Sequence, residues 1–99
     1  MNVIILPEAE IDLEEIADVI SHDAPVRAAS FVRELRLSAL ALEHAPLAYA
    51  LVPRYERRGI RRRIHRRYII FYRIEGNQIF ILRILHGARD YIRLLDTDG

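Results

Sequence analysis

The segment from Arg83 to Tyr91 contains the residues whose types and spacing are best suited to chemistry. It reads RILHGARDY and brings two arginines, a histidine and a tyrosine within nine residues. Side chains of these types could cleave RNA, with one acting as base, one as acid and the guanidinium groups on the scissile phosphate. His65 and Arg66 lie on a neighbouring predicted strand and could join them. A catalytic set needs converging geometry, however, and a histidine at a strand end before a glycine turn is more often structural.

A second cluster is the arginine-rich run at residues 54–67, with eight arginines and one acid in fourteen residues. Three interpretations of this run are open. It could bind the phosphates of a nucleic acid, with Tyr55 and Tyr68 stacking on the bases. It could bind an acidic peptide of a partner protein. It could also be an edge strand whose charges deter aggregation.

Charge and composition narrow the function classes. Residues 1–50 carry three arginines and nine acids, a net charge of −6, whereas residues 51–99 carry twelve arginines and five acids, a net charge of +7. This asymmetry predicts an acidic partner for the second half, although the use of arginine alone also fits codon bias. The chain has no cysteine, no metal-ligand spacing among its four histidines and no glycine-rich phosphate loop, so we expect no metal or cofactor. The first residues lack a signal peptide or membrane span, so we expect a cytoplasmic protein.

Hydrophobic spacing predicts the elements that must position both clusters. Pro7 and the acids after it start a helix, and a second helix follows so closely that the two form an antiparallel αα-hairpin. Gly76-Asn77 is a hairpin signal between two apolar strands. The fold class is therefore α+β, in one domain over residues 1–99. The predicted elements are an N-terminal strand at 2–6, helices at about 7–20 and 25–44, an antiparallel three-stranded meander at 60–67, 68–74 and 79–85, and a short helical tail at 88–95.

The predicted hairpin presents two apolar faces. If Gly76-Asn77 is the turn, the numbers of paired residues sum to 153, and the two faces can be read from the sequence. One face carries Ile69, Phe71, Leu82 and Ile84; the other carries Tyr68, Ile70, Tyr72, Ile81 and Arg83. A sheet that faces water on one side should instead alternate apolar and polar residues. We expect the helices to cover the first face and leave the tyrosine-and-arginine face for a partner. Alternatively, the N-terminal strand, residues 46–58 or the C-terminal tail covers it.

Four ordered segments spread over about 80 residues carry a family resemblance. They are Pro7-x-Ala9-x-x-Asp12-Leu13-x-Glu15-Ile16, Ala28-Ala29-x-Phe31 with Leu35, Tyr68-x-Ile70-x-Tyr72-Arg73-Ile74, and Ile81-Leu82-Arg83-Ile84-Leu85-His86-Gly87-x-Arg89-Asp90. In this order they resemble the ParE toxins of bacterial type II toxin–antitoxin modules. The resemblance implies a β-α-α-β-β-β fold, growth inhibition through DNA gyrase without catalytic residues, and neutralisation by a small ParD-like antitoxin whose C-terminal segment folds along the toxin. It implies no sequence-specific binding of nucleic acid.

The resemblance also implies an alternative and a set of contacts. The RelE-like branch of the same superfamily cleaves mRNA on the ribosome, and Arg83, His86, Arg89 and Tyr91 lie roughly where its basic and aromatic site residues would fall. The chain has no lysine, however, and its His86-Gly87-x-Arg89-Asp90 motif resembles ParE. A degenerate, nontoxic assembly partner is a third possibility. For a ParE-like toxin we expect target contacts at Arg83, His86, Arg89, Tyr91 and Arg93, and antitoxin contacts at Arg61, Arg63, Arg66, Tyr68 and Tyr72.

Overall fold

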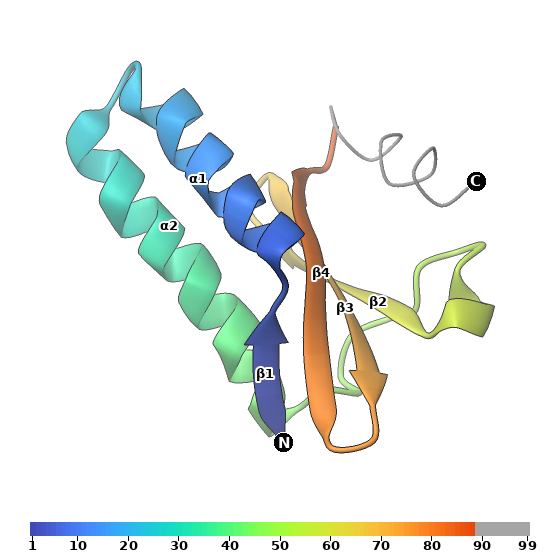
Figure 1. The fold of residues 1–99 in the computed structure, drawn as a ribbon. Coiled ribbons are helices and arrows are strands. Elements are labelled where there is room, and N and C mark those ends of the chain that lie inside the picture. The colour runs from blue at the N-terminus through green and yellow to red at the C-terminus, as the bar shows by residue number, and fades with distance from the viewer. Residues whose placement is uncertain (89–99) are drawn as a thin grey trace.

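The computed structural model describes residues 1–88, and in this range the elements follow the predicted order (Figure 1). They are β1 (Asn2–Ile5), α1 (Pro7–Ser21), α2 (Pro25–Leu40), β2 (Ile60–His65), β3 (Tyr68–Glu75) and β4 (Gln78–His86), with 3-10 helices at Ala41–His44 and Glu56–Arg58. The N-terminal strand, the helical hairpin and the antiparallel meander are therefore confirmed. The predicted helical tail lies outside the described residues except for Ala88, which lies in a turn. Among the described residues, no helix is both long and apolar enough to cross a membrane.

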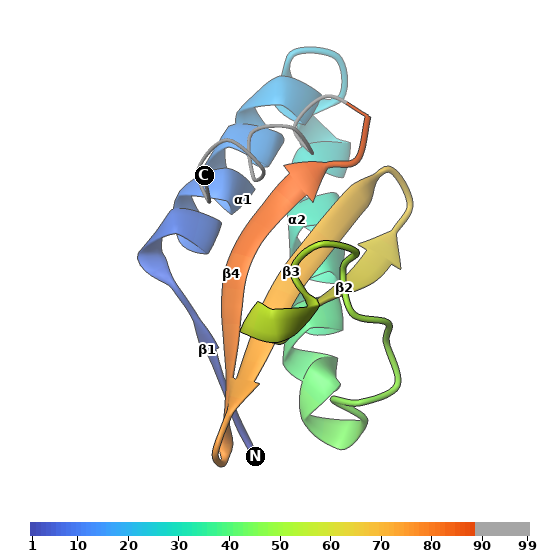
Figure 2. The same cartoon turned by 90° about the vertical axis from the view of Figure 1, so that its right-hand side faces the viewer.

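Prolines set where both helices begin. Pro7 and Pro25 each occupy the first turn, where the missing N–H group would have no partner in the helix. Glu8 and Glu10 add negative charge at the positive end of the α1 dipole. The two helices are antiparallel neighbours and lie together across one face of the sheet (Figures 1 and 2). They form a single helical layer that leaves the other face of the sheet to be covered by something else.

The sheet has the strand order β1-β4-β3-β2, with β1 parallel to β4 and the other pairs antiparallel. The N-terminal strand thus lies beside the last strand, with Val3 opposite Ile79 and Ile5 opposite Ile81. This pairing protects one edge of β4. The opposite edge of the sheet is β2, the arginine-rich strand. The predicted elements therefore become one four-stranded mixed sheet.

The β3–β4 register is the predicted one near the turn and differs beyond it. Pairs from Glu75–Gln78 to Tyr72–Ile81 match the prediction, but Phe71 then pairs with Arg83, so Leu82 is an extra residue in a β-bulge. A one-residue shift reverses which side chains share a face. The predicted pairs Ile69–Ile84 and Phe71–Leu82 are therefore wrong. Figure 2 shows β4 curving along its length, as expected of a bulged strand.

The face that the helices cover is the opposite of the expected one. Leu13 and Leu35 of the helices form one core with the second predicted face, joined by Ile84 after the bulge. The sheet residues of this core are Tyr68, Ile70, Tyr72, Ile79, Ile81 and Ile84. Tyrosine can be buried here because its hydroxyl finds a partner: Tyr72 Oη donates a hydrogen bond of 2.6 Å to the Pro46 carbonyl oxygen.

The other face of the sheet is covered by the chain itself. Val52 and Tyr55 pack on that face in a second core whose sheet residues include Ile60, Phe71 and Leu85. The covering segment is fixed to β2, because Val52 N–H donates to the Ile60 carbonyl oxygen at 2.8 Å. The expectation of an open tyrosine-and-arginine face is therefore wrong, because the helices cover that face. The alternative, in which residues 46–58 cover it, is not what the structure shows: Tyr49 packs beside the helices there, but Val52 and Tyr55 cover the opposite face.

Candidate binding site at the arginine turn

Arg66 and Arg67 form the tight connection between β2 and β3, here called the arginine turn. Both side chains are exposed. Arg66 has a φ of 56°, and the first position of a tight hairpin turn with positive φ usually holds glycine. A non-glycine residue in this conformation costs about 1–3 kcal/mol, and such strain clusters at binding and catalytic sites. The backbone alone would favour glycine here, which points to a role for the Arg66 side chain.

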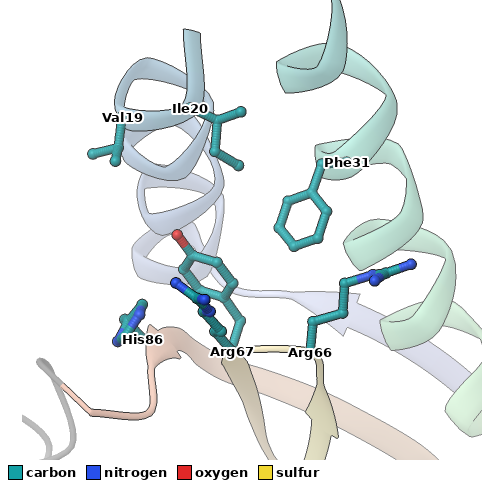
Figure 3. Close-up of a pocket in the computed structure, with 7 residues that line it drawn as sticks. Val19, Ile20, Phe31, Arg66, Arg67 and His86 are labelled. Carbon is teal, nitrogen blue, oxygen red and sulfur yellow. The ribbon is translucent and has the colours of Figure 1, made fainter. Parts of the chain in front are cut away.

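One hollow opens on the helix side of the arginine turn and is called the inner hollow (Figure 3). Its volume is about 470 Å³, and it is lined by Val19, Ile20, Phe31, Arg66, Arg67, Tyr68 and His86. Val19 and Ile20 come from α1 and Phe31 from α2, whereas the two arginines rise from the turn below them (Figure 3). The hollow thus combines an apolar wall with a cationic rim.

Aromatic contacts hold the wall of the inner hollow in place. The ring centroids of Phe31 and Tyr68 are 5.6 Å apart, and Tyr68 meets His86 edge-to-face at 5.4 Å. Phe31 also contacts His65 at 5.8 Å and lies 5.3 Å from the Arg27 guanidinium carbon. These distances are typical of favourable ring pairs. Ring packing therefore fixes the apolar wall of the inner hollow, with the arginines at its rim.

A second hollow, the outer hollow, lies on the opposite side of the sheet. Its volume is about 580 Å³, and it is lined by Ile64, Arg66, Arg67, Ile69, His86, Gly87 and Ala88. Gly87 N–H donates a hydrogen bond of 2.8 Å to the Arg67 carbonyl oxygen. A Cβ at Gly87 would lie 3.2 Å from Ile69 Cδ1, so the close approach favours glycine. The His86-Gly87 sequence therefore connects the end of β4 to the arginine turn. Arg66 and Arg67 of this turn line both hollows.

Two predicted antitoxin contacts, Arg61 and Arg63, hold β2 against neighbouring segments. Arg61 Nη1 donates to the Tyr49 carbonyl oxygen at 2.7 Å, and Arg63 Nη1 donates to the Ser38 carbonyl oxygen at 2.8 Å. The Arg63 guanidinium also lies 5.2 Å from the centre of the Tyr49 ring. Both side chains are only partly buried and keep their charge near the surface. These contacts give Arg61 and Arg63 a structural role in addition to any role in binding.

The two predicted tyrosines lie inside the protein. Tyr72 has no exposed surface and Tyr68 is 7% exposed. Burial raises the pKa of the Tyr72 phenol, since the charged phenolate is disfavoured away from water. Tyr72 cannot touch a partner in this conformation, and Tyr68 contributes a wall of the inner hollow. Of the five predicted antitoxin contacts, only Arg66 is exposed; Arg61 and Arg63 are partly buried, and Tyr68 and Tyr72 are buried.

Arg83 and Asp12 form a bidentate ion pair between β4 and α1. Arg83 Nε donates to Asp12 Oδ2 at 2.8 Å and Arg83 Nη2 donates to Oδ1 at 3.0 Å. Asp12 Oδ2 also accepts the Ile84 N–H at 2.9 Å. The side chains are 18% and 5% exposed, and the ion pair with Asp12 raises the pKa of the Arg83 guanidinium. The Arg83 guanidinium therefore anchors the first helix on the sheet.

The structure separates the predicted target contacts. His86 lines both hollows, whereas Arg83 is bound to Asp12; Arg89, Tyr91 and Arg93 lie outside the described residues. Of the side chains considered for RNA cleavage, His65 is partly buried, with Nδ1 3.1 Å from Ser38 Oγ. Sequence reasoning did not single out Arg67 or Val19 as site residues. Arg67 is the last residue of the strand predicted at 60–67, so its place in the arginine-rich run was the available signal.

Comparisons with known proteins identify the family of this chain. The family model that matches residues 3–91 is described as the ParE toxin of the type II toxin–antitoxin system parDE. A solved structure described as the chromosomal ParDE TA system from P. aeruginosa is similar with a TM-score of 0.74 and 25% sequence identity. That match covers 87% of this chain and 95% of the other chain. No curated protein matches the chain.

Proposed function

Since this chain belongs to the ParE toxin family of type II toxin–antitoxin systems, we propose that it inhibits growth by binding DNA gyrase in the cytoplasm and that a cognate ParD-like antitoxin neutralises it. Family membership supports both partners, because the ParE resemblance implies gyrase as target and an antitoxin as inhibitor. In this proposal the protein acts by binding, as one domain, and has no catalytic residues.

The observation that carries the binding mechanism is the arrangement of the arginine turn between two partly apolar hollows. Exposed guanidinium groups beside apolar walls match an acidic, amphipathic protein segment, which offers carboxylates and apolar side chains together. The acidic partner expected from the net charge of +7 in residues 51–99 would find this surface there. The arginine turn is therefore the proposed centre of the antitoxin interface.

The ion pair of Arg83 argues against the RelE-like alternative. In an RNA-cleaving site an arginine must be able to face the scissile phosphate. Arg83 already binds both oxygens of Asp12, and withdrawing it would leave a largely buried carboxylate without its cation. We therefore place the gyrase contacts on His86, Arg89, Tyr91 and Arg93 and assign Arg83 to the fold.

One pair of assays tests the target. The purified toxin is added to a gyrase supercoiling reaction and, separately, to ribosomes programmed with mRNA. We expect loss of supercoiling, restored by antitoxin, while the mRNA stays intact. Codon-specific cuts in the mRNA with normal supercoiling would overturn the proposal in favour of the RelE-like alternative.

A double variant, Arg89→Ala with Arg93→Ala, tests the proposed gyrase contacts. We expect supercoiling inhibition to weaken by at least about tenfold, because two cations are removed from the target interface. Binding to the antitoxin should change by less than about threefold, which serves as the folding control. Undiminished inhibition by this variant would contradict the assignment.

A further inference from the structure

Only part of the outer edge of β2 forms backbone hydrogen bonds with another segment of the chain. β2 is the last strand of the sheet, and the segment before it covers its first half: Val52 N–H bonds to the Ile60 carbonyl oxygen, and Arg62 N–H bonds to the Ala50 carbonyl oxygen at 3.1 Å. A bridge between Leu51 and Arg61 continues the same pairing. Beyond Arg62 the strand runs on to His65.

The hydrogen-bonding pattern fixes which backbone groups face outward. In an antiparallel pair, alternate residues direct their N–H and C=O groups to the partner strand, and the residues between them direct theirs away. Since Ile60 and Arg62 bond outward to the covering segment, Ile64 must also face outward. Within residues 1–88 neither the N–H nor the C=O group of Ile64 has a hydrogen-bond partner. An open length of sheet edge therefore lies directly before the arginine turn.

The side chains around this open edge select the kind of strand that could pair with it. Ile64 is 64% exposed and lines the outer hollow together with the largely buried Ile69. Five arginines and no acid occur in residues 61–67. An added strand would therefore meet apolar surface on one side of its backbone and positive charge around it. An extended acidic segment with an apolar residue meets both conditions.

Two other occupants fit this edge less well. A second copy of the chain would bring two arginine-rich strands about 5 Å apart, and facing like charges destabilise a strand pair. A single-stranded nucleic acid would gain from exposed rings for stacking, but Tyr55 and Tyr68 are each only 7% exposed. Both tyrosines belong to the cores instead. Charge and exposure therefore favour an acidic protein segment.

We infer that the open edge of β2 at Ile64 adds an extended acidic strand of the antitoxin by β-sheet augmentation, with one apolar side chain of that strand in the outer hollow. The inference rests on the proposed function, because it takes the antitoxin as the partner. It adds a specific backbone contact: the Ile64 N–H donates to the antitoxin, and the Ile64 C=O accepts from it. The arginines flanking the edge then pair with carboxylates on the added strand.

The variant Ile64→Pro tests this backbone contact. Proline removes the outward N–H but no hydrogen bond to β3, and edge strands tolerate proline at such positions. The matched control, Ile64→Thr, also loses the apolar side chain but keeps the N–H. We expect the antitoxin affinity of Ile64→Pro, measured by calorimetry, to be at least about tenfold weaker than that of Ile64→Thr. Equal affinities of two folded variants would overturn the inference.

Hydrogen exchange in the unaltered toxin gives a second test if Ile64→Pro does not fold. The Ile64 amide should exchange rapidly in the free toxin and slowly in the complex with antitoxin. An amide that still exchanges rapidly in a saturated complex contradicts the inference, whereas failure of the proposed function would appear as no complex at all. Protection in the free toxin would show that the chain or a second copy occupies the edge. Protection by an oligonucleotide, but not by antitoxin, would show a nucleic-acid site; either result overturns the inference.

Discussion

Asp12 and Arg83 show how a charged residue in a sequence motif can belong to the fold. Asp12 is 4% exposed and its carboxylate accepts hydrogen bonds from the Arg83 guanidinium and from a backbone N–H of β4. Such a buried charge is tolerated because its oxygens are satisfied by three donors. The sequence marks both residues as part of a family pattern, but only the packing of α1 on β4 shows that they bind one another.

Removing one member of this pair should destabilise the protein. We expect Asp12→Ala to lower the free energy of unfolding by about 3 kcal/mol, because it leaves the Arg83 charge largely buried without its partner. Arg83→Met should cost a similar amount, and the double variant should cost less than the sum of the two. Chemical denaturation of the four proteins measures the coupling. Strictly additive effects would show that the pair is not a unit.

At Arg66 the residue type that suits the backbone differs from the residue type that suits binding. Its φ of 56° suits glycine, so we expect Arg66→Gly to leave stability unchanged or raise it by up to about 1 kcal/mol. Antitoxin affinity should fall in the same variant, because the guanidinium is lost from the rim of both hollows. Thermal unfolding and calorimetry give the two quantities. A loss of stability together with full affinity would reverse the roles assigned here.

At the scale of elements, the bulge at Leu82 decides which β4 residues share the helix-covered face with β3 beyond Tyr72. The turn at Gly76-Asn77 was predictable from residue types, and the first pairs after it agree with the predicted register. An extra residue in one strand leaves no clear sign in a segment such as FILRIL, because both faces are apolar. The predicted faces therefore failed beyond Tyr72, although every strand was predicted close to its observed bounds.

The sequence also left undecided whether the segment before β2, residues 46–58, covers a face of the sheet. It was one of three candidates for covering the sheet, since its prolines and arginines give no helical or strand periodicity. In the structure Val52 is fully buried against the outer face, with Tyr55 and Phe71 in the same core. The segment therefore acts as the second layer of the protein.

A pair of valine variants tests that role. Val52→Ala should lower the free energy of unfolding by about 2 kcal/mol, because a buried side chain loses its contacts. Val26→Ala makes the same chemical change at a position that is 89% exposed, and should stay within about 0.5 kcal/mol of the unaltered protein. Denaturant unfolding compares the two. Equal effects would mean that residues 52–60 do not form a core on this face.

At the scale of the whole molecule, charge is divided between the layers. The acids of residues 1–50 are concentrated on the helical hairpin, and the arginines of residues 54–67 on the covering segment, the edge strand and the turn. This division was visible in the sequence, and it predicted an acidic partner. Which arginines remain available to that partner was not visible, because backbone carbonyl groups from distant segments hold Arg61 and Arg63.

The molecule is a small ParE-type toxin, and the arginine turn is the surface that we propose for antitoxin binding. Both faces of the sheet are covered, and the strand edge and the ends of the strands offer apolar surface beside the exposed arginines of the turn. The positive charge of residues 51–99 would attract an acidic antitoxin to these places, and the two hollows would bind its apolar side chains.

The affinity of the cognate antitoxin for charge-reversed toxins tests this account most directly. The variant Arg66→Glu with Arg67→Glu reverses the turn, and Arg33→Glu with Arg57→Glu makes the same charge change at two exposed arginines elsewhere. Calorimetry should show affinity weakened by at least about 100-fold for the turn variant and by less than about fivefold for the control. Equal weakening of both variants, or no weakening of the turn variant, would contradict the claim that the arginine turn is the centre of the interface.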